Sequence, residues 1–269
     1  MNIRHVFRLA LTGNGAFMKN ILRILLSPIA FGRFIFIVLL TIVLLPSLIT
    51  EDLLAGKNGK YRFIIVQLWA RLILFGLGIV VVYNKMPKTG SYILMPNHRS
   101  YFDIFLMGAI SPSAFIAKIE LLKWPILGLT LKHCRAILVK RDSLRSMLNT
   151  MDAIQQSIKK GTSVTLFPEG TTTLGPGLRA FKSGGFKIAA QLGVQIIPCV
   201  ISYRNKKLAW VSSDPFIKHF MRMMWIPFSI VDVRFGQPLL FSDADKLEHE
   251  TRHAMENMLE PLDKKRNYS

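Results

Sequence analysis

The sequence predicts an α/β fold in which a mostly parallel or mixed sheet is flanked by helices and preceded by an N-terminal hydrophobic helical hairpin. After residue 85, short apolar runs rich in Ile, Val and Phe alternate with helical segments, as in sheets that helices cover on both faces. Before residue 85, the apolar runs are longer and carry few charges. We therefore divide the chain into an N-terminal helical segment, residues 1–84, and an α/β domain, residues 85–269.

Two apolar runs make up the predicted hairpin. Residues 34–49 carry no charge and hold Pro46 near their end, whereas residues 63–83 are interrupted by Gln67 and Arg71. A membrane-spanning helix needs ~20 apolar residues, and an arginine at the bilayer centre is costly. Two interpretations stay open: a pair of spanning helices, or a hairpin immersed in a single leaflet. Core helices of a soluble domain are disfavoured, because a helix that is apolar all round needs lipid or a large core to cover it.

The charge distribution predicts which side of the membrane the domain occupies. Residues 1–33 contain five basic residues and no acid, so the positive-inside rule places this end, and the α/β domain with it, on the cytoplasmic side. The net charge of +19 is concentrated in residues 84–207, which hold eighteen Lys or Arg against five acids. Such a field suits anionic lipid surfaces or phosphorylated substrates. Nucleic acid is a weaker choice, because the sequence contains no nucleic-acid recognition motif.

The α/β domain divides into predicted strands and helices in order. Helices are expected at about 143–160, ending at Gly161, and at about 181–192, ending at Gly193, since glycine is favoured just after a helix. Residues 216–228 combine large apolar side chains with basic ones, which is typical either of an interfacial membrane contact or of an ordinary helix packed on the sheet. The expected strands are 91–96, 114–118, 136–140, 163–167, 195–202 and 229–235.

The segment Asn97–Asp103 holds the best candidates for catalysis. His98 precedes Asp103 by five residues and follows an apolar run. On a regular helix the two side chains would lie ~140° apart, so we expect a turn or a helix start between them. An aspartate that holds an imidazole in one tautomer makes it a better proton acceptor, and histidine titrates near neutral pH. His98 is therefore the predicted base and Asp103 its partner.

Three further blocks accompany this motif in a fixed order. Together with N-H-x4-D at 97–103, they resemble the glycerolipid acyltransferase family, which includes the 1-acylglycerol-3-phosphate acyltransferases. The resemblance covers roughly residues 90–205. The other blocks are Lys118 to Leu122 with W-P-I-L-G at 124–128 and I-L-V-K-R at 137–141, then F-P-E-G-T at 167–171, then I-I-P-C-V at 196–200.

The resemblance implies an acceptor site with a phosphate-binding part. Arg141 matches the arginine of the second block and Lys118 its lysine, and Lys182 and Arg179 are further cations near predicted strand ends. Glu169, Gly170 and Thr171 are expected at the acceptor, with Glu169 accepting hydrogen bonds from a hydroxyl or a basic neighbour. Pro198 is expected on the acyl-chain side. Thr172 stands where the family usually has an arginine, which leaves the acceptor's head group open.

The expected activity is a membrane-bound acyl transfer from acyl-CoA or acyl carrier protein to the hydroxyl of a lysophospholipid. The first candidate acceptor is 1-acyl-sn-glycerol-3-phosphate, which would give phosphatidic acid. Another lysolipid, such as lyso-ornithine lipid, stays open, as do a catalytically silent lipid-binding protein and a thioester or lipid hydrolase. No cofactor or metal is expected. The two cysteines, Cys134 and Cys199, indicate neither a disulfide framework nor a metal site.

Overall fold

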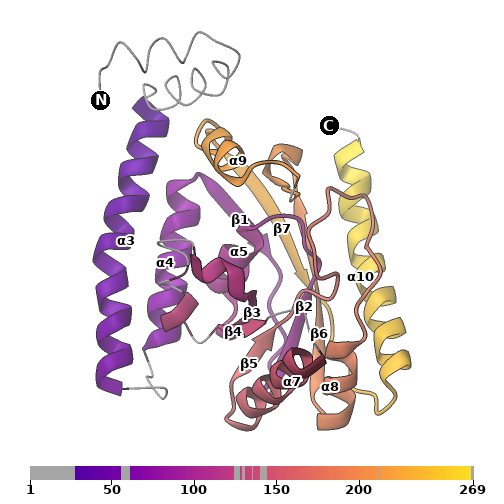
Figure 1. The fold of residues 1–269 in the computed structure, drawn as a ribbon. Helices are drawn as coiled ribbons and strands as arrows, with labels where there is room; N and C mark the ends of the chain where they lie inside the picture. The colour runs from indigo at the N-terminus through magenta and orange to yellow at the C-terminus, as the bar shows by residue number, and fades with distance from the viewer. Residues whose placement is uncertain are drawn as a thin grey trace.

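A seven-stranded mixed sheet forms the centre of the molecule, in the strand order β1-β7-β6-β2-β5-β3-β4 (Figure 1). The computed structural model describes residues 28–55, 61–123, 128, 131–134, 136–139, 144–211 and 213–267. Neighbouring strands are parallel except β6 and β7, which are antiparallel. The predicted mixed sheet is therefore confirmed. The strands are β1 (Ile79–Tyr83), β2 (Tyr92–Pro96), β3 (Ser113–Lys118), β4 (Ile137–Val139), β5 (Ser163–Thr165), β6 (Gln195–Tyr203) and β7 (Ser229–Phe235).

Strand β1 differs from what the sequence analysis expected. The sequence predicts one apolar helical run over residues 63–83, but the helix α4 spans only Arg62–Gly76. Gly78 then adopts a φ of +69°, and the β-branched Ile79–Val82 run continues as an extended strand. β1 pairs with β7 in register from Ile79 opposite Ser229, so the end of the N-terminal segment contributes an edge strand to the sheet.

Helices cover both faces of the sheet. Alternate residues of β2 belong to different cores: Tyr92 and Leu94 face one, Ile93 and Met95 the other. The first core is covered by α4 and by α5 (Phe102–Ile110). The second core is covered by α7 (Leu144–Lys159), α8 (Gly184–Leu192) and α10 (Ala244–Asn267). α7 and α8 match the two expected helices, with starts one and three residues later.

The hairpin consists of α3 (Pro28–Ala55) and α4, which lie side by side (Figure 1). α3 is long and apolar enough to cross a membrane, and 11% of its most apolar stretch is buried. Polar contacts fix it near both ends. Arg33 donates to the backbone carbonyls of residues 224, 226 and 227, whereas Asp52 pairs with Arg62 and accepts a hydrogen bond from His133 Nδ1 at 3.0 Å. The hairpin is therefore joined to the α/β domain at both ends.

Candidate active site

The carboxyl ends of β2, β5 and β6 bring three polar residues of this chain to one edge of the sheet. His98 lies two residues beyond β2, Glu169 lies four residues beyond β5, and Tyr203 is the last residue of β6. β2 is parallel to both neighbours, so all three strands end on the same side. In α/β proteins this edge is where ligands bind.

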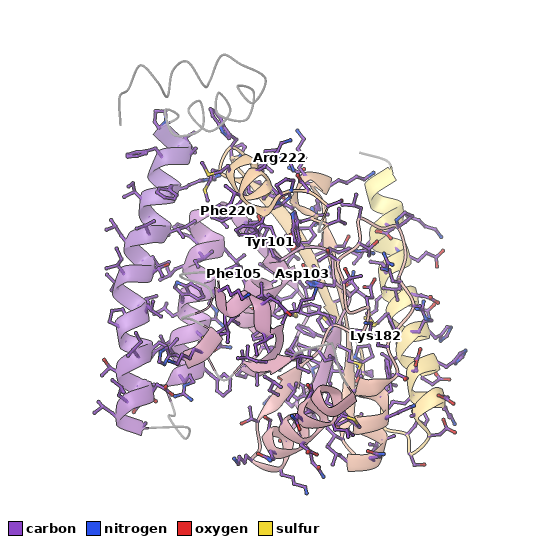
Figure 2. All side chains as sticks on the ribbon, in the orientation of Figure 1. Tyr101, Asp103, Phe105, Lys182, Phe220 and Arg222 are labelled. Carbon is purple, nitrogen blue, oxygen red and sulfur yellow. The ribbon has the colours of Figure 1, made fainter. Side chains whose placement is uncertain are left out.

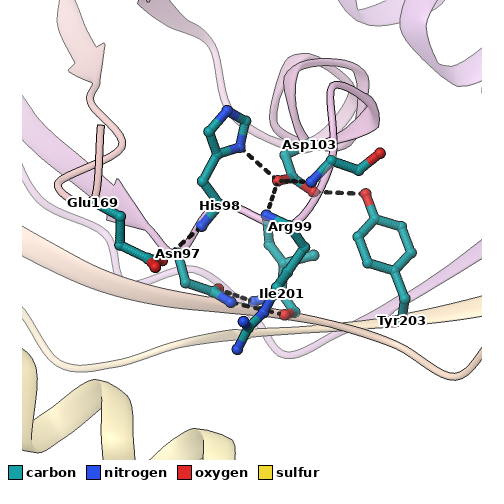
Figure 3. Close-up of polar contacts among 8 residues, drawn as sticks. Asn97, His98, Arg99, Asp103, Glu169, Ile201 and Tyr203 are labelled. Carbon is teal, nitrogen blue, oxygen red and sulfur yellow. Dashed lines mark hydrogen bonds and ion pairs between the residues drawn. The ribbon is translucent and has the colours of Figure 1, made fainter. Parts of the chain in front are cut away.

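His98 and Asp103 meet as the sequence predicted. α5 begins at Phe102, so Asp103 lies in its first turn and points back at the preceding loop. The His98 Nδ1 atom lies 2.8 Å from Asp103 Oδ2 (Figure 3). The imidazole also stacks on Phe167, with ring centroids 4.1 Å apart. The expected helix start between the two residues is confirmed.

The Asp103 carboxylate is fully buried and held by three further donors. Oδ2 accepts hydrogen bonds from the amides of Arg99 at 2.6 Å and Ser100 at 2.9 Å, and Oδ1 accepts one from the Tyr203 hydroxyl at 2.6 Å. Burial and the neighbouring Asp103 raise the pKa of Tyr203 well above its ordinary value, so the phenol remains a donor. Asp103 accepts a hydrogen bond at each of these contacts. The ring hydrogen of His98 therefore lies on Nδ1, which leaves Nε2 as the ring nitrogen that can accept a proton.

The backbone of His98 is fixed from two sides. Glu169 Oε1 accepts the His98 amide at 2.9 Å, and the His98 carbonyl accepts the Thr173 amide at 3.0 Å. The other oxygen of Glu169 accepts the Arg179 amide at 3.0 Å. Just before His98, the Asn97 side chain pairs with both backbone groups of Ile201 on β6, at 2.6 and 3.1 Å. The loop that carries His98 is thus tied to the F-P-E-G-T segment and to β6.

Glu169 lies in a different setting from the one expected. Its side chain is 3% exposed, and each of its oxygens accepts a backbone amide. This arrangement favours a role in holding the His98 loop over a contact with an acceptor hydroxyl. Gly170 has a φ of +67°, and a Cβ there would lie 2.8 Å from Lys182 Cε. The absence of a Cβ at Gly170 therefore leaves room for the Lys182 side chain.

The predicted cations lie at the same edge of the sheet where the structure describes them. Lys118 is the last residue of β3 and is exposed, and Lys182 is exposed beside Gly170. Thr171 is exposed, whereas Thr172 is 8% exposed. Arg141 lies outside the described residues. Pro198 is buried in the middle of β6, on the face that α10 covers, and its expected place on the acyl-chain side stays a prediction.

Sequence reasoning missed two residues of this site. Tyr203 follows directly on the predicted strand 195–202, and a polar aromatic residue at a strand end was the available signal. Arg99 is 2% exposed and donates from its guanidinium to the Gly177 carbonyl at 2.8 Å. Two backbone amides in the first turn of α5 already have partners: those of Asp103 and Ile104 donate to the carbonyls of residues 100 and 101. Within the described residues, no group of three His, Cys, Asp or Glu side chains could hold a metal ion.

Comparison with known proteins identifies the family. Residues 79–202 match the Acyltransferase family. A probable 1-acyl-sn-glycerol-3-phosphate acyltransferase of Mycoplasma genitalium is 30% identical over 196 residues, which are 69% of this chain and 71% of that protein. The chain belongs to the acyltransferase family. The resemblance predicted from its four blocks is confirmed.

Other members of the acyltransferase family match over a smaller share of their length. The 1-acyl-sn-glycerol-3-phosphate acyltransferase of Neisseria gonorrhoeae is 34% identical over 55% of this chain and 58% of its own. The lyso-ornithine lipid O-acyltransferase of Pseudomonas aeruginosa is 30% identical over 56% of this chain and 60% of its own. The matches therefore span less than two thirds of these relatives. The crystal structure of the LPA acyltransferase PlsC from Thermotoga maritima shares the fold, with a TM-score of 0.62 and 21% identity over 86% of this chain and 98% of that one.

Proposed function

We propose that this chain transfers a fatty acyl group from a thioester, either acyl-CoA or acyl carrier protein, to the hydroxyl of a lysophospholipid. The first candidate acceptor is 1-acyl-sn-glycerol-3-phosphate, which would give phosphatidic acid. The observation that carries the proposal is the His98–Asp103 pair. The Nδ1 atom of His98 is fixed by the buried carboxylate of Asp103, and the Nε2 atom of His98 lies on the far side of the ring from Asp103 (Figure 3).

In the proposed reaction, Nε2 of His98 accepts the hydroxyl proton as the acceptor oxygen attacks the thioester carbonyl carbon. The C–S bond of the tetrahedral intermediate then breaks, an ester is formed, and the departing thiolate takes the proton back from Nε2. Asp103 stabilises the imidazolium between these two steps. No protein nucleophile is required. Burial raises the pKa of the Cys134 thiol to about 12 and that of Cys199 well above its ordinary value, so neither thiol supports an acyl-enzyme.

Lys182 and Lys118 are the proposed partners of the acceptor's phosphate, together with Arg141, which the family resemblance adds. Lys182 crosses Gly170 next to the His98 loop, so its ammonium group is well placed for an anionic head group. Glu169 is proposed to hold the His98 loop, and Gly170 to admit the lysine. Thr171 is exposed beside them and stays a candidate acceptor contact.

A lyso-ornithine lipid is the second candidate acceptor. Thr172 is buried at the position where the family usually has an arginine, so this position offers no cation for a phosphate. Relatives from Pseudomonas aeruginosa and Rhizobium meliloti carry the name lyso-ornithine lipid O-acyltransferase, at 30% and 27% identity. This acceptor lacks the phosphate that Lys182 and Lys118 would bind, which is why it comes second.

The hairpin is proposed to lie in one leaflet, with the α/β domain on the cytoplasmic side. The domain lies beside the hairpin, to which it is joined near Arg33 and near Asp52 (Figure 1). If α3 crossed the bilayer along its axis, the charged domain next to it would enter the hydrocarbon, which is costly. A hairpin whose axis follows the membrane plane avoids this cost and leaves the site facing the headgroups.

Thiol release from oleoyl-CoA tests the proposal. The purified chain in detergent is assayed with a panel of lysolipids, with none, and beside His98→Ala. We expect release only with a lysolipid, best with 1-acyl-sn-glycerol-3-phosphate, and its loss in the variant with membrane binding unchanged. Residual activity within about tenfold of the parent would remove His98 from the base role. Release without acceptor would indicate a hydrolase, and no release with either acyl-CoA or acyl carrier protein would favour a lipid-binding protein.

A further inference from the structure

An exposed surface of mixed apolar and basic character lies next to the first part of α3. We call it the α9 surface, because it consists of the outer side of α9 (Phe216–Met223) and the segment that follows. Figure 1 shows α9 beside the N-terminal end of α3, and Figure 2 shows Arg222 on its outer side. The apolar members Ile217, Trp225 and Phe228 are 56%, 41% and 57% exposed. The charged members are Lys218 and Arg222.

The α9 surface is continuous with the apolar exterior of α3. The guanidinium of Arg33 donates to the carbonyls of Met224 at 3.1 Å, Ile226 at 2.5 Å and Pro227 at 2.6 Å. These bonds hold the 224–228 segment against the first turns of α3. The same turns expose Ile29 and Phe31, which are 60% and 49% accessible. Trp225 and Phe228 belong to this segment, so the junction places them next to this end of α3.

Exposed lysines lie on α9 and on the short helix next to it. Lys206 and Lys207 are exposed on the short helix η3 (Lys206–Leu208), which α9 contacts through a hydrogen bond between His219 Nε2 and the Lys207 carbonyl. Arg222 pairs with Asp214. Among the residues that the structure describes, no carboxylate forms an ion pair with Lys206, Lys207 or Lys218. Their charges are available to an external anion.

We infer that the α9 surface is a second membrane contact, which docks on a bilayer containing anionic lipids. Tryptophan and phenylalanine are favoured where apolar membrane meets headgroups, and a lysine near an anionic surface adds attraction. A soluble acidic protein could meet the lysines, but it would leave the aromatic side chains facing the lipid around α3. This inference rests on the proposed membrane association of the hairpin, and it adds a contact that the apolar runs do not supply.

The docked surface is joined directly to the catalytic loop. On the inner side of α9, His219 is buried, and its Nδ1 accepts a hydrogen bond from the Tyr101 hydroxyl at 2.9 Å. Tyr101 is the residue just before α5, between His98 and Asp103. A second link joins the Trp210 amide to the Arg99 carbonyl at 2.8 Å. Docking of α9 thus sets the distance of His98 from the membrane. It holds His98 at the level of the headgroups, which is where the hydroxyl of a lysolipid lies.

A fluorophore at position 225 tests this inference in the full-length chain. Two variants, Trp225→Cys and Phe228→Cys, are prepared separately in a Cys134→Ser background. Each is labelled at the introduced cysteine with an environment-sensitive dye and added to phosphatidylglycerol or phosphatidylcholine vesicles. Leu148→Cys is the matched control, because Leu148 is 52% exposed on α7 at the far end of the molecule (Figure 1). We expect a blue shift and protection from aqueous iodide at 225 and 228 on anionic vesicles, and neither at 148. Lys206→Ala, Lys207→Ala and Lys218→Ala should each weaken this protection about fivefold.

Two results would overturn the inference. One is that iodide quenches the dye at positions 225 and 228 as freely as the dye at position 148, while the chain stays bound to the vesicles through α3. The other is protection at 225 by acyl carrier protein and not by vesicles, which would assign the surface to a protein partner. The readout requires no turnover, so it is independent of the thiol-release assay: an inactive chain can still show docking, and an active one can fail to.

Discussion

Replacing Glu169 with glutamine separates the two roles considered for this residue. The side chain keeps its size, but one oxygen acceptor becomes an NH₂ donor. At present the two oxygens accept the amides of His98 at 2.9 Å and Arg179 at 3.0 Å, in a site that is 3% exposed. In the variant, one amide faces an NH₂ group and loses its partner, and the other keeps only a neutral acceptor.

The expected cost follows from these two changes. A hydrogen bond to a charged group contributes about 1.5–3 kcal/mol and a neutral one about 1 kcal/mol, so losing one and weakening the other costs on the order of 3 kcal/mol. For a chain of this length each kcal/mol lowers Tm by about 2–4 °C, which gives a fall of roughly 6–12 °C. kcat should fall by about a hundredfold, because a misplacement of about 1 Å at a catalytic group has that effect. The acceptor KM should change little.

Thermal unfolding in detergent and steady-state thiol release measure both quantities. Glu260→Gln is the matched control, since it removes the same charge from an exposed pair with Lys264 on α10 and should leave Tm and kcat unchanged. If Glu169 instead contacts the acceptor hydroxyl, Tm stays within about 2 °C of the parent and the acceptor KM rises. That outcome would refute the positioning role.

Three further substitutions test other parts of the site. Tyr203→Phe removes the buried hydroxyl that donates to Asp103 Oδ1, so we expect unfolding to become easier by about 2 kcal/mol in a denaturant titration, with a reduced kcat; unchanged values of both would show that this bond is dispensable. Lys182→Met keeps the length of the side chain without its charge and should raise the KM for a phosphate-bearing lysolipid about tenfold, yet leave the donor KM unchanged; an equal loss with a phosphate-free lysolipid would assign Lys182 to another task. Arg141→Ala should likewise raise the acceptor KM, and an unchanged value would assign Arg141 to structure or to the donor.

The sequence predicted what depends on neighbours along the chain. The short apolar runs predicted six strands of the sheet, and the spacing of His98 and Asp103 predicted a helix start, because a five-residue separation is incompatible with one regular helix through both. The glycines at 161 and 193 marked the ends of α7 and α8, and Gly193 does adopt the left-handed conformation with a φ of +60°.

What the sequence could not predict depends on pairing between distant segments. Tyr203 contacts Asp103 from 100 residues away, and only the parallel register of β6 on β2 brings it there. The apolar run that forms strand β1 fits either a buried helix or a strand, and its partner β7 lies some 150 residues later, so the sequence alone does not distinguish the two. Glu169 resembled a substrate-binding carboxylate in sequence, but its partners are two amides that only the folded chain positions.

The bonds of Arg33 have a consequence for the order in which the protein is made. Their carbonyl partners lie 191 to 194 residues further along the chain. At about 5–20 residues per second, a ribosome needs about 10–40 s after Arg33 to synthesise the residues whose carbonyls it binds. Throughout that interval an apolar helix of 28 residues must be kept from aggregating, which the bilayer can do as soon as the helix enters it. A bilayer that holds α3 during this interval would serve as the support to which the 224–228 segment is added, before α10 (Ala244–Asn267) completes the chain.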